Sequence, residues 1–240
     1  MTWVKICGTT NLEDALTAVD AGADAVGFVF YEKSPRNISA EAARAIVEKL
    51  PESVEKIGVF VAPDAKHCVR VVQEAGLTGT QTYVSMVESG TAPATGASLF
   101  PVGARHLMAF HMSVFLENAN ETAHASSEVA ESEEKIPTSI PEGQMQTVLL
   151  DSGDLRMPGG TGKTFDWQRA IPISREMRRS GVNIVVAGGL TPANVAEAIS
   201  ILNPWGVDVV SGVEATPGKK DPEKVRAFVK AVREADRKTS

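Results

Sequence analysis

Short apolar segments alternate along the chain with longer segments that carry apolar residues at helical spacing. The apolar segments that fit strands are residues 4–7, 25–30, 57–61, 81–84, 106–114, 147–152, 183–187 and 206–210. Helical spacing or a helix-start signal marks residues 12–19, 39–50, 64–75, 166–180, 191 onward and 225–232. Strands that are apolar on both faces and alternate with amphipathic helices indicate a parallel sheet covered by helices. Eight such strands in 240 residues predict an α/β protein, a single (β/α)8 barrel spanning residues 1–240.

The middle of the chain fits this pattern less well. Residues 90–97 are rich in glycine, proline and threonine and make a poor helix. Residues 117–143 are polar and acidic, without apolar periodicity. We therefore expect an irregular region where the fourth and fifth helices should be, with a mobile insertion at 117–143.

Polar residues predict where two of the helices begin. Asn11 follows the first strand and is a plausible N-cap for the helix after it. Thr191 precedes Pro192, and this pair predicts an N-cap followed by proline at the first helical position.

Composition limits the classes of partner. The net charge of −6 and the pI near 5.3 provide no basic field for nucleic acid or an anionic membrane. No apolar run approaches the roughly 20 residues that span a bilayer, and no signal-peptide pattern is present. Cys7 and Cys68, the two cysteines, lie far apart in sequence, so we expect two free thiols in a reducing, cytoplasmic setting. The histidines form no metal-ligand pattern, and we expect no metal.

Reactive side chains stand where predicted strands end. Cys7 ends the first strand, Asp151 the sixth, and Arg36 lies in the loop after the second. Taken singly, these residues fit a buried thiol, an N-capping carboxylate and a solvated cation. In a (β/α)8 barrel, however, the loops after the strands share one face, so the three side chains should converge.

Two glycine-containing turns follow the last two strands. They are formed by Gly188 with Gly189 and by Ser211 with Gly212. Each alone could be an ordinary tight turn. Loops at these two positions commonly bind phosphate through backbone N–H groups, so together they favour a phosphate site.

Two lysines leave alternatives open. Residues 159–164 are glycine-rich and include Lys163, but Met157 stands where a nucleotide P-loop needs glycine. Lys163 could lie on a substrate lid or on a solvated turn. Lys5 shares a strand face with Cys7 and could form an imine or act as a counterion for a carboxylate. We prefer the counterion, and we expect Lys5 to lower the pKa of Cys7.

Six motifs in order resemble the signatures of the phosphoribosylanthranilate isomerase family of tryptophan biosynthesis. They are residues 5–8, 34–36, 150–152, 159–167, 187–190 and 211–214. The resemblance implies an aldose–ketose isomerase that rearranges N-(5'-phosphoribosyl)anthranilate to 1-(2-carboxyphenylamino)-1-deoxyribulose 5-phosphate without cofactor or metal.

The resemblance also implies roles for individual residues. Cys7 would be the general base and Asp151 the general acid, Arg36 would contact the anthranilate carboxylate, and the two glycine turns would hold the phosphate. The chain departs from the family at residues 81–84, where the family usually has Gln-Leu-His-Gly, and in the long acidic segment 117–143.

Alternative functions remain at this stage. One is another phosphosugar isomerase or an aldolase on the same barrel, and another is a catalytically silent phosphate-ligand binding barrel. The expected partner is a small phosphosugar, with the chain a monomer or homodimer.

Overall fold

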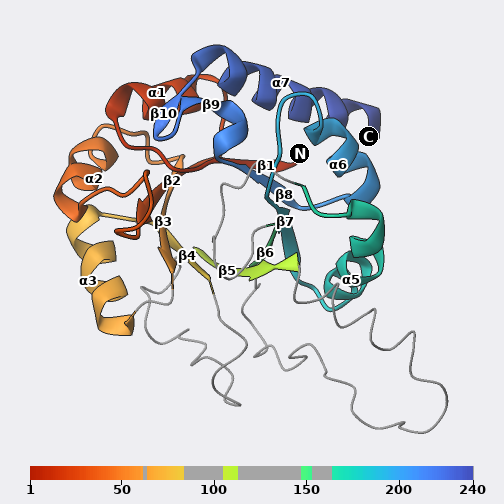
Figure 1. The fold of residues 1–240 in the computed structure, drawn as a ribbon, viewed down its shortest axis with the longest axis horizontal. Helices are drawn as coiled ribbons and strands as arrows, with labels where there is room; N and C mark the ends of the chain where they lie inside the picture. The colour runs from red at the N-terminus through yellow and green to blue at the C-terminus, as the bar shows by residue number, and fades with distance from the viewer. Residues whose placement is uncertain (62–63, 84–104, 113–146, 153–163, 240) are drawn as a thin grey trace, which may run out of the picture.

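Eight parallel strands close into a barrel in the computed structural model, which describes residues 1–61, 64–83, 105–112, 147–152 and 164–239. The strands are β1 (Trp3–Ile6), β2 (Ala25–Phe30), β3 (Glu55–Val61), β4 (Gly79–Tyr83), β5 (Arg105–His111), β6 (Thr147–Asp151), β7 (Asn183–Val186) and β8 (Gly206–Val209). Each strand pairs in parallel with the next, and β8 returns to pair with β1. The predicted (β/α)8 barrel is confirmed (Figure 1).

Helices surround the barrel. They are α1 (Leu12–Asp20), α2 (Ala40–Val47), α3 (Ala65–Ala75), α5 (Trp167–Arg179), α6 (Val195–Leu202) and α7 (Pro222–Thr239). A short 3-10 helix, η1 (Ser211–Val213), and a small antiparallel pair, β9 (Glu214–Thr216) with β10 (Lys219–Lys220), lie between β8 and α7. Residues 90–97 and the predicted insertion at 117–143 lie outside the described residues, whereas β5 between them is described.

Helix starts agree with the sequence at one predicted cap and not at the other. The Asn11 side chain accepts a hydrogen bond from the Asp14 N–H and caps α1 as expected. The expected cap at Thr191 is wrong, because α6 begins at Val195. Residues 191–194 instead form a turn in which the Asn194 side chain accepts from the Thr191 N–H at 2.7 Å. The turn satisfies that backbone group locally and delays the helix.

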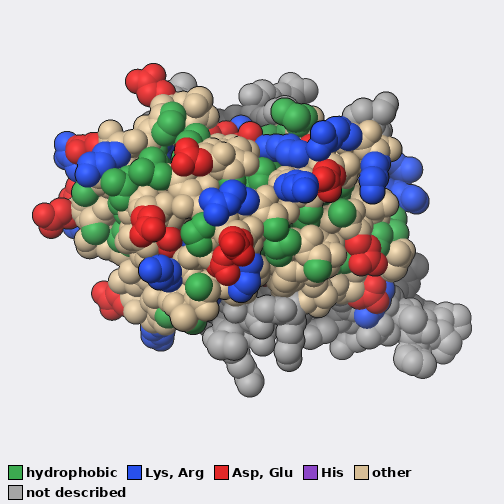
Figure 2. All heavy atoms as spheres, turned by 90° about the horizontal axis from the view of Figure 1, so that it is seen from above, with side chains coloured by type: hydrophobic (Ala, Val, Ile, Leu, Met, Phe, Trp, Pro, Cys, Tyr) green, Lys and Arg blue, Asp and Glu red, His purple; other side chains and the backbone are tan. Residues whose placement is uncertain are grey.

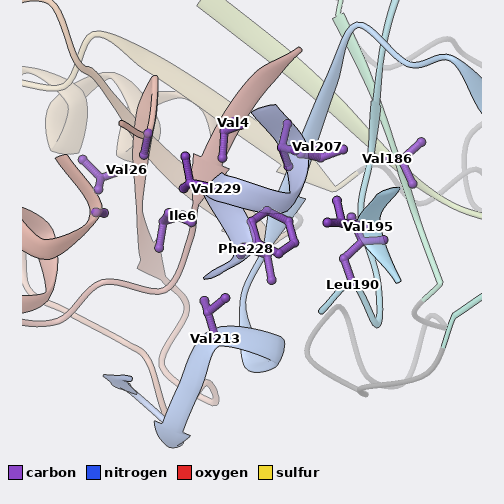
Figure 3. Close-up of a cluster of buried hydrophobic side chains, with 14 of the residues drawn as sticks. Val4, Ile6, Val26, Val186, Leu190, Val195, Val207, Val213, Phe228 and Val229 are labelled. Carbon is purple, nitrogen blue, oxygen red and sulfur yellow. The ribbon is translucent and has the colours of Figure 1, made fainter. Parts of the chain in front are cut away.

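The main core lies between the strands and the helices. Val4 and Ile6 of β1 point outward into it, and both are fully buried. Phe228 and Val229 of α7 belong to the same core and lie beside β1 (Figure 3). Burial of one such side chain contributes roughly 1.5–3 kcal/mol. The outward residues of each strand therefore attach the helices and leave the inward residues for the barrel interior.

A second, smaller core fills the barrel. Trp3 stacks on Trp205 with ring centroids 5.2 Å apart, and the Arg105 guanidinium lies 4.7 Å from the Trp205 ring centroid. Arg105 also donates to Glu55 at 2.6 Å. These residues lie at the amino-terminal ends of β1, β3, β5 and β8, so this end of the barrel is closed by packing.

Hydrogen bonds connect the last helix to the residue before β1 and to the turn before β2. Asp236 of α7 accepts hydrogen bonds from the backbone and the hydroxyl of Thr2, the latter at 2.6 Å. Arg233 donates to the Thr2 carbonyl, to the Gly22 carbonyl and to Asp24. Residues near the two ends of the chain are therefore bonded beside β1, the strand with which β8 pairs to close the barrel.

The surface charge, the helices and the cysteines agree with what the composition predicts. Basic and acidic side chains are interspersed on the face shown in Figure 2, which has no large field of one sign. Among the helices that the structure describes, none is long and apolar enough to cross a bilayer. Cys7 and Cys68 are both buried, free thiols, as expected.

Candidate active site

A cavity of about 300 Å³ opens where the carboxyl ends of the strands meet. Its lining includes all but one of the site residues expected from the sequence, namely Cys7, Arg36, Asp151, Gly188, Gly189 and Ser211. Gly212 is the exception, because its backbone packs beneath the loop after β7. The predicted convergence is therefore observed for six residues that lie up to about 200 positions apart.

Cys7 follows β1 and is 3% exposed. Its sulfur occupies the space left by Gly27 of β2, where an added Cβ would lie 2.5 Å from the Cys7 Sγ. Burial raises the pKa of the Cys7 thiol above its ordinary value, while the nearby Lys5 cation acts in the opposite direction. We expected Lys5 to lower this pKa, and the net shift is the reverse because burial outweighs the lysine.

Lys5 lies one layer below Cys7 inside the barrel. Its ammonium group donates to Gln81 at 2.7 Å and lies 2.7 Å from a carboxylate oxygen of Asp208. Burial lowers the pKa of Lys5, but Asp208 and, to a smaller extent, Cys7 raise it by more. Lys5 therefore stays charged and acts as a counterion, which is the interpretation preferred from the sequence.

Asp151 ends β6 and is 3% exposed. The Tyr83 hydroxyl of β4 donates to its Oδ2 at 2.7 Å. Burial and the Asp151 carboxylate raise the pKa of Tyr83 well above its ordinary value, so this phenol stays protonated. The carboxyl group is thus oriented by a hydroxyl donor at the edge of the cavity.

Arg36 forms a two-point contact with Glu214. The Nε and Nη2 atoms donate to the two Glu214 oxygens at 2.9 and 2.7 Å. Burial raises the pKa of Glu214, but Arg36 and Lys220 lower it by more, so this side chain stays ionised. The contact fixes the guanidinium at the cavity wall.

Lys220 connects the loop after β8 to the end of β1. Its ammonium group is fully buried and donates to the Cys7 carbonyl at 2.5 Å, to the Val210 carbonyl at 3.3 Å and to Glu214 at 3.2 Å. The Lys220 N–H also donates to Asp14 at 2.8 Å. One lysine therefore fixes the backbone that carries Cys7 relative to the Glu214–Arg36 pair.

The two glycine turns lie against each other. Gly188 and Gly189 both have a positive φ, of 81° and 62°, which favours glycine. A Cβ on Gly212 would lie 1.9 Å from the Leu190 carbonyl oxygen. Glycine at these positions lets two backbone segments meet at the cavity, an arrangement that suits an anion held by N–H groups.

Four residues of this site were not singled out from the sequence as site residues: Tyr83, Asp208, Glu214 and Lys220. Asp208 had a signal, because it is a lone charge inside an apolar strand. Glu214 belongs to one of the quoted motifs. Lys220 follows Lys219 in a charged segment, and such a pattern is typical of exposed residues.

Other sequence expectations are not tested by the geometry. Lys163 and most of the glycine-rich segment 159–164 lie outside the described residues. Within the part of the chain that the structure describes, no group of His, Cys, Asp and Glu side chains could hold a metal ion.

Comparison with known proteins identifies the family. A family model described as N-(5'phosphoribosyl)anthranilate (PRA) isomerase matches residues 4–86 and 118–231. An N-(5'-phosphoribosyl)anthranilate isomerase from Geobacter sp. (strain M21) is 42% identical over 229 residues, covering 95% of this chain and 97% of its own.

Two solved structures extend the comparison to the fold. A phosphoribosyl anthranilate isomerase in complex with reduced 1-(o-carboxyphenylamino)-1-deoxyribulose 5-phosphate superimposes with a TM-score of 0.70 at 35% identity, covering 98% of this chain and 100% of its own. Monomers of the dimeric phosphoribosylanthranilate isomerase from Thermotoga maritima give 0.72 at 35% identity, with the same coverage.

Proposed function

The chain belongs to the N-(5'-phosphoribosyl)anthranilate isomerase family, and on that premise we propose that Cys7 and Asp151 are its general base and general acid. The enzyme is an isomerase of tryptophan biosynthesis, and its reaction is an Amadori rearrangement of a phosphosugar. The observation that carries the assignment of roles is that one cavity holds both buried groups, each at the end of its strand.

Asp151 acts in the first step. It gives its proton to the furanose ring oxygen while the nitrogen lone pair forms the iminium bond and the C1'–O bond breaks. The product is an open-chain iminium cation and an ionised Asp151. The Tyr83 hydroxyl lies where it can stabilise that carboxylate.

Cys7 acts in the second step. The thiolate removes the proton from C2', and the electron pair neutralises the iminium to give an enolamine, which tautomerises to the ketone. The raised pKa of Cys7 in the ligand-free site makes the order of events matter. Once ring opening has created a cation beside the thiol, that charge favours loss of the thiol proton to solvent, which leaves the thiolate, and it also acidifies C2'.

Binding groups surround these two residues. We assign the anthranilate carboxylate to Arg36, whose guanidinium is fixed by Glu214. We assign the phosphate to the backbone of the turns at Gly188–Gly189 and Ser211–Gly212. These assignments place opposite ends of the substrate on charges and dipoles that are already oriented, so little reorganisation accompanies binding.

Lys5 disfavours the aldolase alternative. An imine-forming lysine must lose its charge, whereas Lys5 is held by Asp208 and Gln81 and its pKa is raised. Borohydride reduction in the presence of substrate should therefore leave the protein unmodified.

The roles of Cys7 and Asp151 are tested by Cys7→Ser and Asp151→Asn in an assay that follows the loss of phosphoribosylanthranilate fluorescence. Each should lower kcat by roughly 10²–10⁴ with a smaller change in KM. Cys68→Ala is the matched control, since Cys68 lies on α3 away from the cavity. Near-normal kcat in either site variant removes that residue from its role.

The assembly of this chain is part of the proposal. The Thermotoga maritima relative is dimeric, and we propose that this chain is a monomer or a homodimer that binds a small phosphosugar. Light scattering on the purified protein distinguishes the two states.

A further inference from the structure

Tyr83 ends β4 at the cavity. Its hydroxyl donates to Asp151 Oδ2 at 2.7 Å, although the two residues are separated by 68 positions in sequence. Both residues line the cavity. The end of β4 therefore places a phenol against the carboxyl group that we assign as the general acid.

The register of the barrel explains how the contact is made. Tyr83 of β4 pairs with Ala109 of β5, and β5 pairs in turn with β6, which ends in Asp151. Two strand spacings of about 4.8 Å separate β4 from β6. Ala109 is fully buried inside the barrel, and the Tyr83 ring packs against the same interior cluster. A methyl group at position 109 leaves room for the ring to extend past β5.

The same strand supports the base side of the site. Inward positions alternate along β4, so Gln81 and Tyr83 both point into the barrel. Gln81 accepts from Lys5 beneath Cys7, and Tyr83 donates to Asp151. One strand thus contacts both the lysine below the base and the acid.

We propose that Tyr83 is a positioning residue for proton donation: its hydroxyl orients the Asp151 carboxyl group and stabilises the carboxylate that forms when the proton leaves. This inference rests on the proposed role of Asp151. A hydrogen bond to an ionised oxygen is about twice as strong as one to a neutral oxygen. The bond therefore strengthens as Asp151 gives up its proton, and it acts on the transition state more than on substrate binding.

The chemistry requires the phenol to remain a donor. Burial and Asp151 keep Tyr83 protonated, so its hydroxyl hydrogen points at Oδ2 and the proton that is donated to substrate resides on the other carboxyl oxygen. The tyrosine fixes which oxygen of Asp151 acts as the acid.

The test is a double-mutant cycle between Tyr83→Phe and Asp151→Asn, measured with the isomerase substrate. Tyr83→Phe alone should lower kcat about 10-fold to 100-fold, as for a lost hydrogen bond to a charged group, and should change KM by less than about twofold. In the Asp151→Asn background, Tyr83→Phe should change kcat by less than about twofold, because the group it acts through is gone.

A second background keeps the cycle measurable if Asp151→Asn has no detectable rate. Asp151→Glu moves the carboxyl group by one methylene relative to the tyrosine, so Tyr83→Phe should cost less there than in the native chain. Melting temperature and binding of a product analogue, measured for every variant, report folding and an intact cavity.

The outcomes separate this inference from the proposed function. An equal loss of kcat in all backgrounds, or no loss in the native chain, overturns the role of Tyr83 and leaves Asp151 in place. Near-normal turnover in Asp151→Asn overturns the acid assignment itself, and the role of Tyr83 with it.

Discussion

Cys7 is a thiol whose pKa burial raises above its ordinary value. Only the thiolate is alkylated, and Cys7 ionises at a higher pH than an exposed thiol does. The alkylation rate of Cys7 should therefore keep rising with pH beyond the point where the rate of an exposed thiol, with a pKa near 8.5, levels off. Iodoacetamide labelling of a Cys68→Ala variant isolates the signal of Cys7. Lys5→Met removes the cation that opposes this shift, so the curve should move to still higher pH. A rate that is already constant at neutral pH would contradict the assignment.

Arg36 should contribute mainly to binding. Arg36→Ala removes the fixed guanidinium and should raise KM roughly 30-fold or more, the effect of losing one partner of a buried charge pair, with a smaller fall in kcat. Arg36→Lys keeps the charge but loses the two-point contact with Glu214. The KM of Arg36→Lys should therefore lie between the KM of the native chain and that of Arg36→Ala. A collapse of kcat at constant KM would move Arg36 from binding to chemistry.

Individual residues of the site were predictable where strand position determines their place. Asp151 ends a strand, Cys7 and Arg36 follow strands, and the barrel brings such positions together whatever side chains fill its interior. Tyr83 was not predictable, because its role depends on the small Ala109 beside it and on a partner 68 positions away. The net pKa shift of Cys7 was missed because burial cannot be weighed against Lys5 without the packed structure.

The loops after β7 and β8 act as a pair. Gly212→Ala would bring a Cβ within 1.9 Å of the Leu190 carbonyl oxygen, so the two backbones must separate. We expect phosphate-bearing ligands to bind at least about 10-fold more weakly, with an accompanying loss of stability of roughly 1–3 kcal/mol. Calorimetric titration with a product analogue measures the first effect. Gly181→Ala, in an open turn with a φ of 77° and no neighbouring atoms within 4 Å, is a control away from the cavity: it should cost stability through backbone strain and leave ligand binding unchanged.

The pairing of β4 with β5 carries a pH dependence. Burial lowers the pKa of His106 from 6.5 to about 4, and its ring lies 2.6 Å from the Thr80 hydroxyl. Between these values the unfolded chain binds a proton that the folded chain does not. The resulting stability is present above pH 6.5 and is lost as the pH falls towards 4, by at most about 3 kcal/mol.

Urea unfolding between pH 7.5 and 4.5 tests this dependence. The His106→Gln variant should lose less stability over that interval than the native chain, because glutamine does not titrate. Parallel curves for the two proteins would show that other groups account for the slope.

The number and order of the strands could be predicted from the sequence, whereas the residues at which helices begin were less predictable. Alternation of apolar segments gave all eight strands, since burial on both faces leaves a clear signal. The start of α6 was missed by one turn, because residues 191–194 form a turn that the Asn194 side chain closes on the backbone N–H of Thr191. The acidic segment 117–143 lies outside the described residues, and its character as an insertion stays a prediction.

The contact of α7 with Thr2 and with the turn between α1 and β2 stabilises the molecule as a whole. Arg233→Ala removes donors to the Thr2 and Gly22 carbonyls and to Asp24, in a region where the arginine side chain is 22% exposed. We expect the free energy of unfolding to fall by roughly 1–3 kcal/mol with kcat unchanged, because the contact lies away from the cavity. Thermal unfolding and the fluorescence assay measure the two quantities. Arg226→Ala, on the same helix, is a surface control.

Since Thr2 and Asp236 are hydrogen-bonded, the two ends of the chain lie close enough for a short peptide to connect them. New ends could be opened at Gly181, in the exposed turn between α5 and β7, away from the cavity. Such a circular permutant would encode β7 and β8 first and would still follow the same path in space. The position of the phosphate-binding loops in the gene, before or after the strands that carry the base and the acid, is therefore separable from the geometry that these elements form.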